Sequence, residues 1–254
     1  DFMSTIKITS EVASSLSTAI IPLISGGTPE SILFSAGMQP LVQKAFESIL
    51  SDIFSKSITK RECARLGASY RAAVSKVNEN IANGISFRTD GLFIYNGLNY
   101  SKAEDILESV LKSSMNDTEQ KKAVFYGYFI GNLAFCPEVD YSSALSIQKI
   151  VNQLTYFHLC IIKYLKRQGT LNADSWKQVL NNTNDIKGLD IYHGLKEIVR
   201  FDLTDKVAPF RLGEEVGNIK LGALGEAMYK LMDLDKIDEA DLAQIVELAQ
   251  KMHK

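Results

Sequence analysis

Basic side chains are the residues whose type and spacing most suggest chemistry in this chain, because six of them gather in one short segment. These six are Lys56, Lys60, Arg61, Arg65, Arg71 and Lys76. At 3.6 residues per helical turn they form two stripes. Lys56/Lys60/Arg71 would border the apolar face, and Arg61/Arg65/Lys76 would lie roughly opposite it. We interpret the cluster as a solvated flank of a helix, and the alternative is a contact with nucleic acid or an acidic partner.

A second basic group lies on and around a short segment with helical periodicity. Its members are Lys187, His193, Lys196, Arg200, Lys206 and Arg211. Acidic residues are interleaved with them, namely Asp185, Asp190, Glu197 and Asp202. Balanced charges do not sustain tight phosphate binding. We therefore expect a protein contact here, and the alternative is DNA binding through Leu189–Arg200 with help from Lys206, Arg211 and the first cluster.

The histidines and cysteines do not lie at the spacing of metal ligands. His158 and Cys160 are two residues apart, which places them on different faces of a helix. The chain has no Gly-x-Ser-x-Gly elbow, and Gly26-Gly27 lacks the lysine of a phosphate-binding loop. We predict no metal, no cofactor and no catalytic residues. An enzyme stays open as an alternative, because active sites need not be marked by a local motif.

The segment Val12–Gln43 contains one charged residue, Glu30, although 23% of the whole chain is charged. Its apolar positions are interrupted by Ser, Thr, Gly and Pro22, whereas a membrane-spanning helix needs about 20 predominantly apolar residues. We expect two short helices hinged at Gly26-Gly27 and buried against the rest of the fold. The alternative is a hairpin that meets a membrane or a partner.

Composition sets broad limits on the class of protein. The chain has 254 residues, of which 46% are hydrophobic, and its 28 basic and 30 acidic residues give a net charge of −2. These values are typical of a globular protein without the positive field of a dedicated nucleic-acid binder. The cysteines, Cys63, Cys136 and Cys160, are odd in number and far apart, so we expect buried, reduced thiols and a cytoplasmic location.

Helices are the elements predicted to position most of these residues. Apolar residues at three- and four-residue steps predict a helix over Thr59–Ala82, with Gly84 as its stop. The capping box Ser101–Glu104 opens a second helix. A third is expected over residues 116–135, and one long helix is expected from Ser142 to Gln168, ended by Gly169.

Small residues recur every four positions on the third of these helices, at Ala123, Gly127 and Gly131. Such a row lets a neighbouring backbone approach closely, and in a water-soluble bundle it indicates core packing. We therefore predict that this helix lies directly on another one.

The chain changes in character after Gly169. Short helices are predicted around Asp174–Leu180 and Leu189–Arg200, then paired strands within Phe201–Pro209 and Val216–Leu221, then two more helices. This is the element order of a winged helix, a helix-turn-helix variant with a β-wing. The predicted fold class is therefore mainly α. A helical bundle over residues 1–141 is followed by a winged-helix-like region with a small β-hairpin over residues 142–254.

Two segments resemble a family of uncharacterised bacterial α-helical proteins. Lys121-Lys122 precedes a small-residue helix ending in Asn132-Leu133-Ala134, and Gln153-Leu154-Thr155-Tyr156 lies in the next predicted helix. The layout over Lys121–Leu234 is distantly similar to Abi-alpha-type phage abortive-infection proteins. The resemblance implies an architecture and a setting in phage defence or mobile elements, and it implies no catalytic residues.

The favoured function is a non-enzymatic bacterial protein-interaction module. Its partner would be another protein or a second copy of the chain, because the last two predicted helices each carry a full apolar stripe. The alternative is a DNA-binding winged-helix regulator. A second alternative is a membrane-acting effector that uses Val12–Gln43, although we expect neither a membrane nor a metal as partner.

Overall fold

The computed structural model describes residues 45, 49, 50, 52, 53, 57–94, 100–176, 186–207 and 216–252, and of residues 186–188, 251 and 252 only the backbone. The chain divides into two compact units, residues 1–148 and 149–254, and each is described by itself. The boundary expected between residues 141 and 142 stays a prediction. Val12–Gln43, Lys56 and Arg211 lie outside the described residues, so the membrane-acting alternative also stays a prediction.

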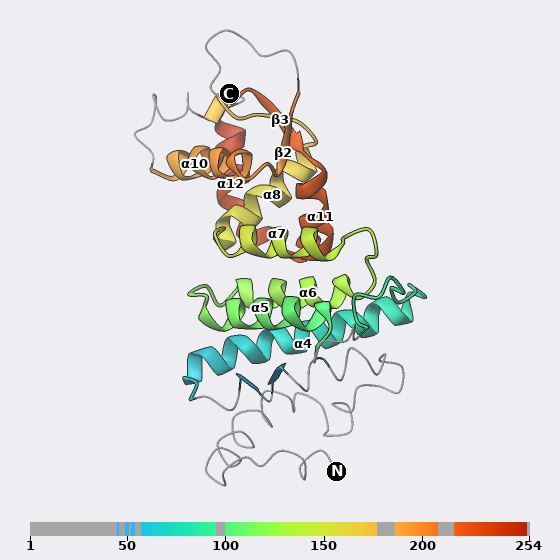
Figure 1. Ribbon diagram of the computed structural model, residues 1–254. Helices are drawn as coiled ribbons and strands as arrows, with labels where there is room; N and C mark the ends of the chain where they lie inside the picture. The colour runs from blue at the N-terminus through green and yellow to red at the C-terminus, as the bar shows by residue number, and fades with distance from the viewer. Residues whose placement is uncertain are drawn as a thin grey trace. The chain divides into compact units, whose positions relative to one another are not determined.

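The first unit is built from helices, and two of them begin at capping boxes. The helices are α4 (Lys60–Ala82), α5 (Lys102–Asn116), α6 (Lys122–Leu133) and α7 (Tyr141–Val151), of which α7 runs on past residue 148 (Figure 1). Ser101 and Glu104 form the predicted capping box at the start of α5, and Thr59 and Glu62 form another at the start of α4. Gly84, just after α4, has a φ of +70°, so the predicted stop is confirmed.

Glycines let α6 lie directly on α4. A Cβ on Gly127 would lie 2.2 Å from the Ser69 carbonyl oxygen and 2.6 Å from the Cβ of Ala72, and one on Gly131 would lie 2.7 Å from the Cβ of Lys76. No side chain fits at such distances, so the two backbones touch along this seam. The close packing predicted from the four-residue spacing is confirmed.

The helix predicted over residues 116–135 starts too early. α5 runs to Asn116, and α6 begins only at Lys122. Between them Asp117 has an extended backbone, and its Oδ1 accepts a hydrogen bond from the Glu119 amide at 2.9 Å. A carboxylate that binds the backbone two residues on favours a turn over a helix, and the chain turns here.

The single long helix predicted over Ser142–Gln168 is also wrong, because the structure has two helices there. α7 ends at Val151, and α8 (Tyr156–Gln168) begins after Thr155, which has an extended backbone with ψ of 167°. The Thr155 hydroxyl accepts a hydrogen bond from the His158 amide at 3.3 Å. This N-cap offers the backbone a helix start where hydrophobic periodicity alone indicates a continuation. Gly169 ends α8 with a φ of +73°, as predicted.

The second unit surrounds α8. It contains β1 (Leu171–Asn172), α10 (Ile186–Arg200), β2 (Thr204–Lys206), β3 (Asn218–Leu221), α11 (Ala223–Leu231), the 3-10 turn η1 (Leu234–Lys236) and α12 (Glu239–Met252). The strands form one antiparallel sheet in the order β1-β3-β2. Thr204 pairs with Leu221 and Lys206 with Ile219 in the β2–β3 hairpin, while Leu171 pairs with Ile219 on the other edge of β3.

The last helices pack on α8 within this unit. Met228, Leu231, Leu242 and Ile245 are completely buried. Lys163 of α8 fixes the turn between α11 and α12, because its buried ammonium donates to the carbonyl oxygens of Asp235 at 3.0 Å and Ile237 at 2.7 Å. The apolar stripes on which we based self-association are therefore covered by this chain itself.

The described part of the chain is thus mainly helical with a small three-stranded antiparallel sheet. The predicted mainly α class is confirmed at this level. Cys63, Cys136 and Cys160 are buried and form no disulfide with one another, as expected. No helix among the described residues is long and apolar enough to span a bilayer.

Candidate functional site

The predicted helix Leu189–Arg200 is present as the later part of α10, and its buried side fixes which residues it exposes. Ile191, Leu195 and Ile198 face inward and are 0–1% exposed. Leu189 and His193 are exposed on the other side of the helix. Because the inward residues recur at three- and four-residue steps, the same periodicity determines which residues of α10 face outward.

Gly194 places α10 directly against α8. A Cβ at this position would lie 2.3 Å from Cδ1 of Ile161 and 3.4 Å from Cδ2 of His158. The terminal methyl group of Ile161 therefore fills the space over the glycine, and a larger residue there would require that methyl group to move. The helix that carries the candidate residues therefore packs closely on α8 at this glycine.

The cations of α10 are largely engaged within the helix. Arg200 Nη2 lies 2.5 Å from Oε2 of Glu197, and the Arg200 guanidinium lies 4.6 Å from the ring centroid of Phe201. Lys196 Nζ lies 5.6 Å from the ring centroid of Tyr192. The carboxylate of Glu197 beside the Arg200 guanidinium offsets part of the positive charge that a phosphate would meet, so pairing weakens this face as a phosphate binder.

The hairpin next to α10 carries mixed charges. Asp205 and Lys206 are both exposed on β2, and Lys220 is exposed on β3. α10 contacts β2, so the helix lies next to the strand that begins the hairpin (Figure 1). Two other predicted contact residues remain. Lys187 belongs to α10, but only its backbone is described, and Arg211 lies outside the described residues.

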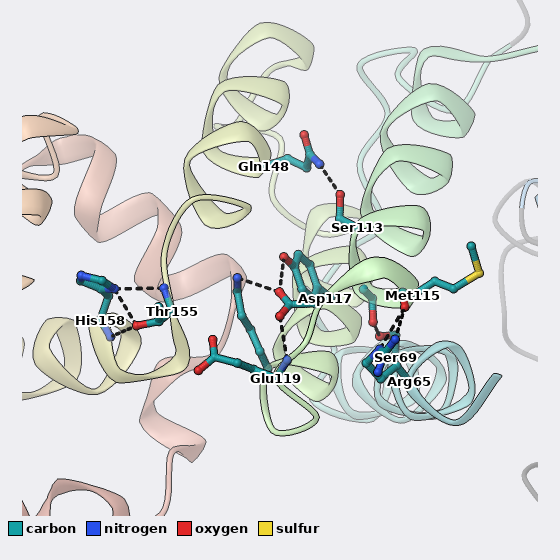
Figure 2. A network of polar contacts seen from close by, with 12 residues as sticks. Arg65, Ser69, Ser113, Met115, Asp117, Glu119, Gln148, Thr155 and His158 are labelled. Carbon is teal, nitrogen blue, oxygen red and sulfur yellow. Dashed lines mark hydrogen bonds and ion pairs between the residues drawn. The ribbon is translucent and has the colours of Figure 1, made fainter. Parts of the chain in front are cut away.

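In the first unit, Lys60, Arg61 and Arg71 of the basic cluster are exposed on α4. Arg65 is half-buried and hydrogen-bonds a neighbouring helix. Its Nε and Nη2 donate to the Met115 carbonyl oxygen at 2.9 and 2.7 Å (Figure 2). Because that carbonyl lies in the last turn of α5, Arg65 acts as a C-terminal cap, and its guanidinium is committed to the fold.

Lys76 corrects our interpretation of the second basic stripe. The stripe Arg61/Arg65/Lys76 was expected on the solvent side of the helix, but Lys76 is only 7% exposed and its Cβ faces Gly131 of α6. Its ammonium lies 2.9 Å from Oε1 of Glu79. Small residues on α6 draw the neighbouring backbone over this side of α4, which the charge pattern of α4 does not reveal.

Sequence reasoning missed a buried polar cluster around Asp117 (Figure 2). Asp117 Oδ2 lies 2.8 Å from Lys122 Nζ and accepts a hydrogen bond from Tyr126 Oη at 3.1 Å. Burial raises the pKa of Asp117, but hydrogen bonds from Lys122 and the Glu119 amide outweigh it and leave the pKa lowered. Burial and then the charge of Asp117 raise the pKa of Tyr126.

This cluster has the residue types of an acid–base site, but a substrate has no access to them. Lys122 and Tyr126 are each 2% exposed, so no substrate reaches their ammonium or hydroxyl. Its chemistry is structural, because it joins the turn after α5 to the first turn of α6. A lysine at the start of an otherwise apolar helix, five residues after an aspartate, is the signal that a sequence search could have used.

A cavity of about 450 Å³ lies beside the start of α4 and the end of α5. Its charged lining residues are Asp52, Glu62, Glu108 and Lys112. Glu62 belongs to the capping box of α4, and Glu108 pairs with Lys112. Glu62 therefore serves a helix end, and Glu108 and Lys112 serve a helix surface. In the part of the chain that the structure describes, no group of three or more His, Cys, Asp or Glu side chains is placed to hold a metal ion.

Comparison with known proteins does not place the chain in a family. No protein-family model matches it, and neither a curated protein nor a solved structure does.

Proposed function

We propose that residues 149–254 form a winged-helix-like module of a non-enzymatic bacterial protein, and that it binds a protein partner through α10 and the β2–β3 hairpin. The order α8-β1-α10-β2-β3 and the sheet order β1-β3-β2 support the winged-helix part. In this assignment α8 is the first helix of the motif, α10 is the third, and the hairpin is the wing. The second helix, predicted around Asp174–Leu180, lies largely outside the described residues. A setting in phage defence or mobile elements follows only from the resemblance described above.

Charge balance on the described surface is the observation that carries the choice of a protein partner. Over residues 189–207 and 216–221 the cations are Lys196, Arg200, Lys206 and Lys220, and the carboxylates are Asp190, Glu197, Asp202 and Asp205. Four cations are thus balanced by four carboxylates before any phosphate is bound, whereas duplex binding needs an excess of cations. The exposed Leu189 adds an apolar contact of the kind that protein interfaces use.

A DNA-binding regulator remains the second candidate, because the same topology favours it. In helix-turn-helix proteins the last helix of the motif enters the major groove, and α10 has that place in the order of elements. His193, Lys196 and Arg200 would then face the duplex, with Lys206 and Lys220 of the hairpin on the phosphates.

A photo-crosslinking amino acid at His193, in cells that express the protein, tests the proposal. We expect it to capture a defined protein that the same probe at Gln250, an exposed residue of α12, does not capture. Fluorescence anisotropy with duplex DNA at 50 mM salt provides the opposing test. Binding that weakens steeply with salt and is reduced by Lys206→Ala would overturn the protein-partner proposal in favour of DNA.

A further inference from the structure

The first turn of α8 is closed by a capping box in which histidine has the place normally taken by glutamate or glutamine (Figure 2). The His158 amide donates to Oγ1 of Thr155 at 3.3 Å, and the Thr155 amide donates to Nδ1 of His158 at 3.0 Å. The Thr155 hydroxyl also lies 2.7 Å from the same Nδ1. Two backbone amides at the start of α8 thus depend on this pair of side chains.

The geometry fixes the protonation state of the ring. A backbone N–H can only donate, so Nδ1 must offer its lone pair, and the ring proton must be on Nε2. A proton taken up from solvent adds to Nδ1, so the Thr155 amide loses its acceptor, and the new Nδ1–H can donate only to the Thr155 hydroxyl. The resulting positive charge also lies at the positive end of the α8 dipole, which disfavours it.

The capping box lies at the contact between α8 and α10. His158 Cδ2 and Nε2 lie 3.4 and 3.7 Å from the position of a Cβ on Gly194. The orientation of this ring therefore supports the packing of α10 on the start of α8. Rotation of the ring out of the capping box would remove that support.

The charged groups around this turn come from several elements. On α10, Asp190 and Glu197 lie one helical turn on either side of Gly194, Glu197 is paired with Arg200, and His193 adjoins the glycine. On α12, Asp241 Oδ2 accepts a hydrogen bond from Tyr156 Oη at 2.8 Å. η1 and α11 bind α8 at Lys163 and Lys166, more than a turn further along, and the charged residue of β3 is Lys220. A carboxylate that paired with the protonated ring would stabilise the helix at low pH, whereas loss of the cap would destabilise it. The direction in which stability changes with pH therefore distinguishes the two effects.

We propose that Thr155 and His158 form a pH-sensitive helix cap, which closes the start of α8 when the imidazole is neutral and opens it, together with the α8–α10 contact, when the imidazole is protonated. Imidazole is the side chain that ordinarily changes charge between about pH 5 and 8. The folded helix prefers the neutral ring, so the stabilisation is complete above this range and is lost as pH falls through it. This inference is independent of the identity of any partner.

His158→Glu is the decisive variant, because glutamate restores the common capping box without titrating in this range. Between pH 7.5 and 5.5 we expect the Tm of the wild type to fall by about 2–4 °C more than that of His158→Glu. His158→Gln, which also keeps an acceptor, should behave like His158→Glu, and His193→Gln should keep the wild-type response. Hydrogen exchange of residues 156–160, corrected for intrinsic rates, should accelerate at pH 5.5 in the wild type alone.

A two-bond ¹H–¹⁵N spectrum reads the tautomer directly, and at pH 7.5 it should show Nδ1 of His158 without a proton. A protonated Nδ1 at that pH would overturn the proposal. Equal pH dependence of the wild type and both acceptor variants would also overturn it, as would greater protection of residues 156–160 at pH 5.5.

Discussion

Arg88 carries its charge inside the first unit and binds main-chain carbonyl groups there. Its side chain is 1% exposed, and its guanidinium donates to the carbonyl oxygens of Leu133 and Cys136 at 3.1 Å and of Val139 at 3.0 Å. It also pairs with Asp90, and this hydrogen bond is the main reason why the pKa of Asp90 is lowered. One side chain thus holds the segment that leaves α6.

Substitution of Arg88 should be among the most damaging changes in the first unit. We expect Arg88→Ala to lower the free energy of unfolding by about 3–5 kcal/mol, because buried carbonyl oxygens lose their donors and Asp90 loses its counter-ion. Arg88→Lys keeps the charge but not the planar fork and should cost about 1–3 kcal/mol. Urea unfolding measures both, and Arg61→Ala on the exposed side of α4 should change stability by less than about 0.5 kcal/mol. Equal effects of Arg88→Ala and Arg61→Ala would contradict this role.

Asp117 should make the stability of the protein depend on acidic pH. Its pKa is lowered from the usual 3.8, so its contribution is complete above that value and is lost as pH falls through the folded-state pKa. Asp117→Asn should cost about 2 kcal/mol at pH 7, where the carboxylate accepts charge-assisted hydrogen bonds. In urea unfolding, the difference from the wild type should narrow between pH 5 and 2.5. A difference that stays constant would show that the carboxylate charge is not responsible.

At the scale of elements, the α4–α6 seam reverses the usual effect of alanine in a helix. Replacing glycine by alanine inside an exposed helix stabilises it by about 1 kcal/mol. Gly127→Ala should instead destabilise the protein by about 3 kcal/mol, because the new Cβ would lie 2.2 Å from the Ser69 carbonyl oxygen. Val124→Ala, at a half-buried position of the same helix, is the control and should cost about 1 kcal/mol or less. A stabilising Gly127→Ala would disprove the close approach.

Lys163 and Lys166 form a matched pair on α8, one buried and one at the surface. Lys163→Met should cost about 2–3 kcal/mol, because the carbonyl oxygens of Asp235 and Ile237 lose their donor between η1 and α12. Lys166 pairs with Glu226 at 2.8 Å with both side chains more than two-fifths exposed, so Lys166→Met should cost less than about 1 kcal/mol. Urea unfolding followed by tryptophan fluorescence distinguishes them, and similar losses would contradict the capping role of Lys163.

Sequence patterns within a few residues predicted the helix starts and stops that depend on neighbouring residues. The capping box at Ser101, the stops at Gly84 and Gly169 and the small-residue row of α6 all depend on neighbours within a few residues. The breaks at Asp117 and Thr155 were missed because side-chain hydrogen bonds outweigh helical periodicity there. For the candidate site, α10 and the hairpin were predicted, whereas the burial of Lys76 depends on which helix covers it and cannot be inferred from α4 alone.

At the scale of the molecule, the two compact units should unfold separately, and the chain contains a probe for one of them. Its one tryptophan, Trp176, is completely buried in the second unit against Tyr164, with ring centroids 6.2 Å apart. Fluorescence therefore reports residues 149–254, whereas circular dichroism reports helices of both units. We expect Lys163→Met to lower the fluorescence midpoint in urea and Arg88→Ala to leave it unchanged while splitting the dichroism curve. If both variants moved both signals together, the chain would unfold as a single cooperative body.

The close contact at Gly194 between α8 and α10 affects how the surface that we propose as a binding site can move. A slide of α10 by one turn along its axis would bring Asp190 or Ile198 to the position of Gly194, where a Cβ would lie 2.3 Å from Cδ1 of Ile161. A piston-like displacement of this helix therefore requires the Ile161 side chain to move aside. A partner that pushed α10 along its axis from the exposed face would thus also have to repack α8.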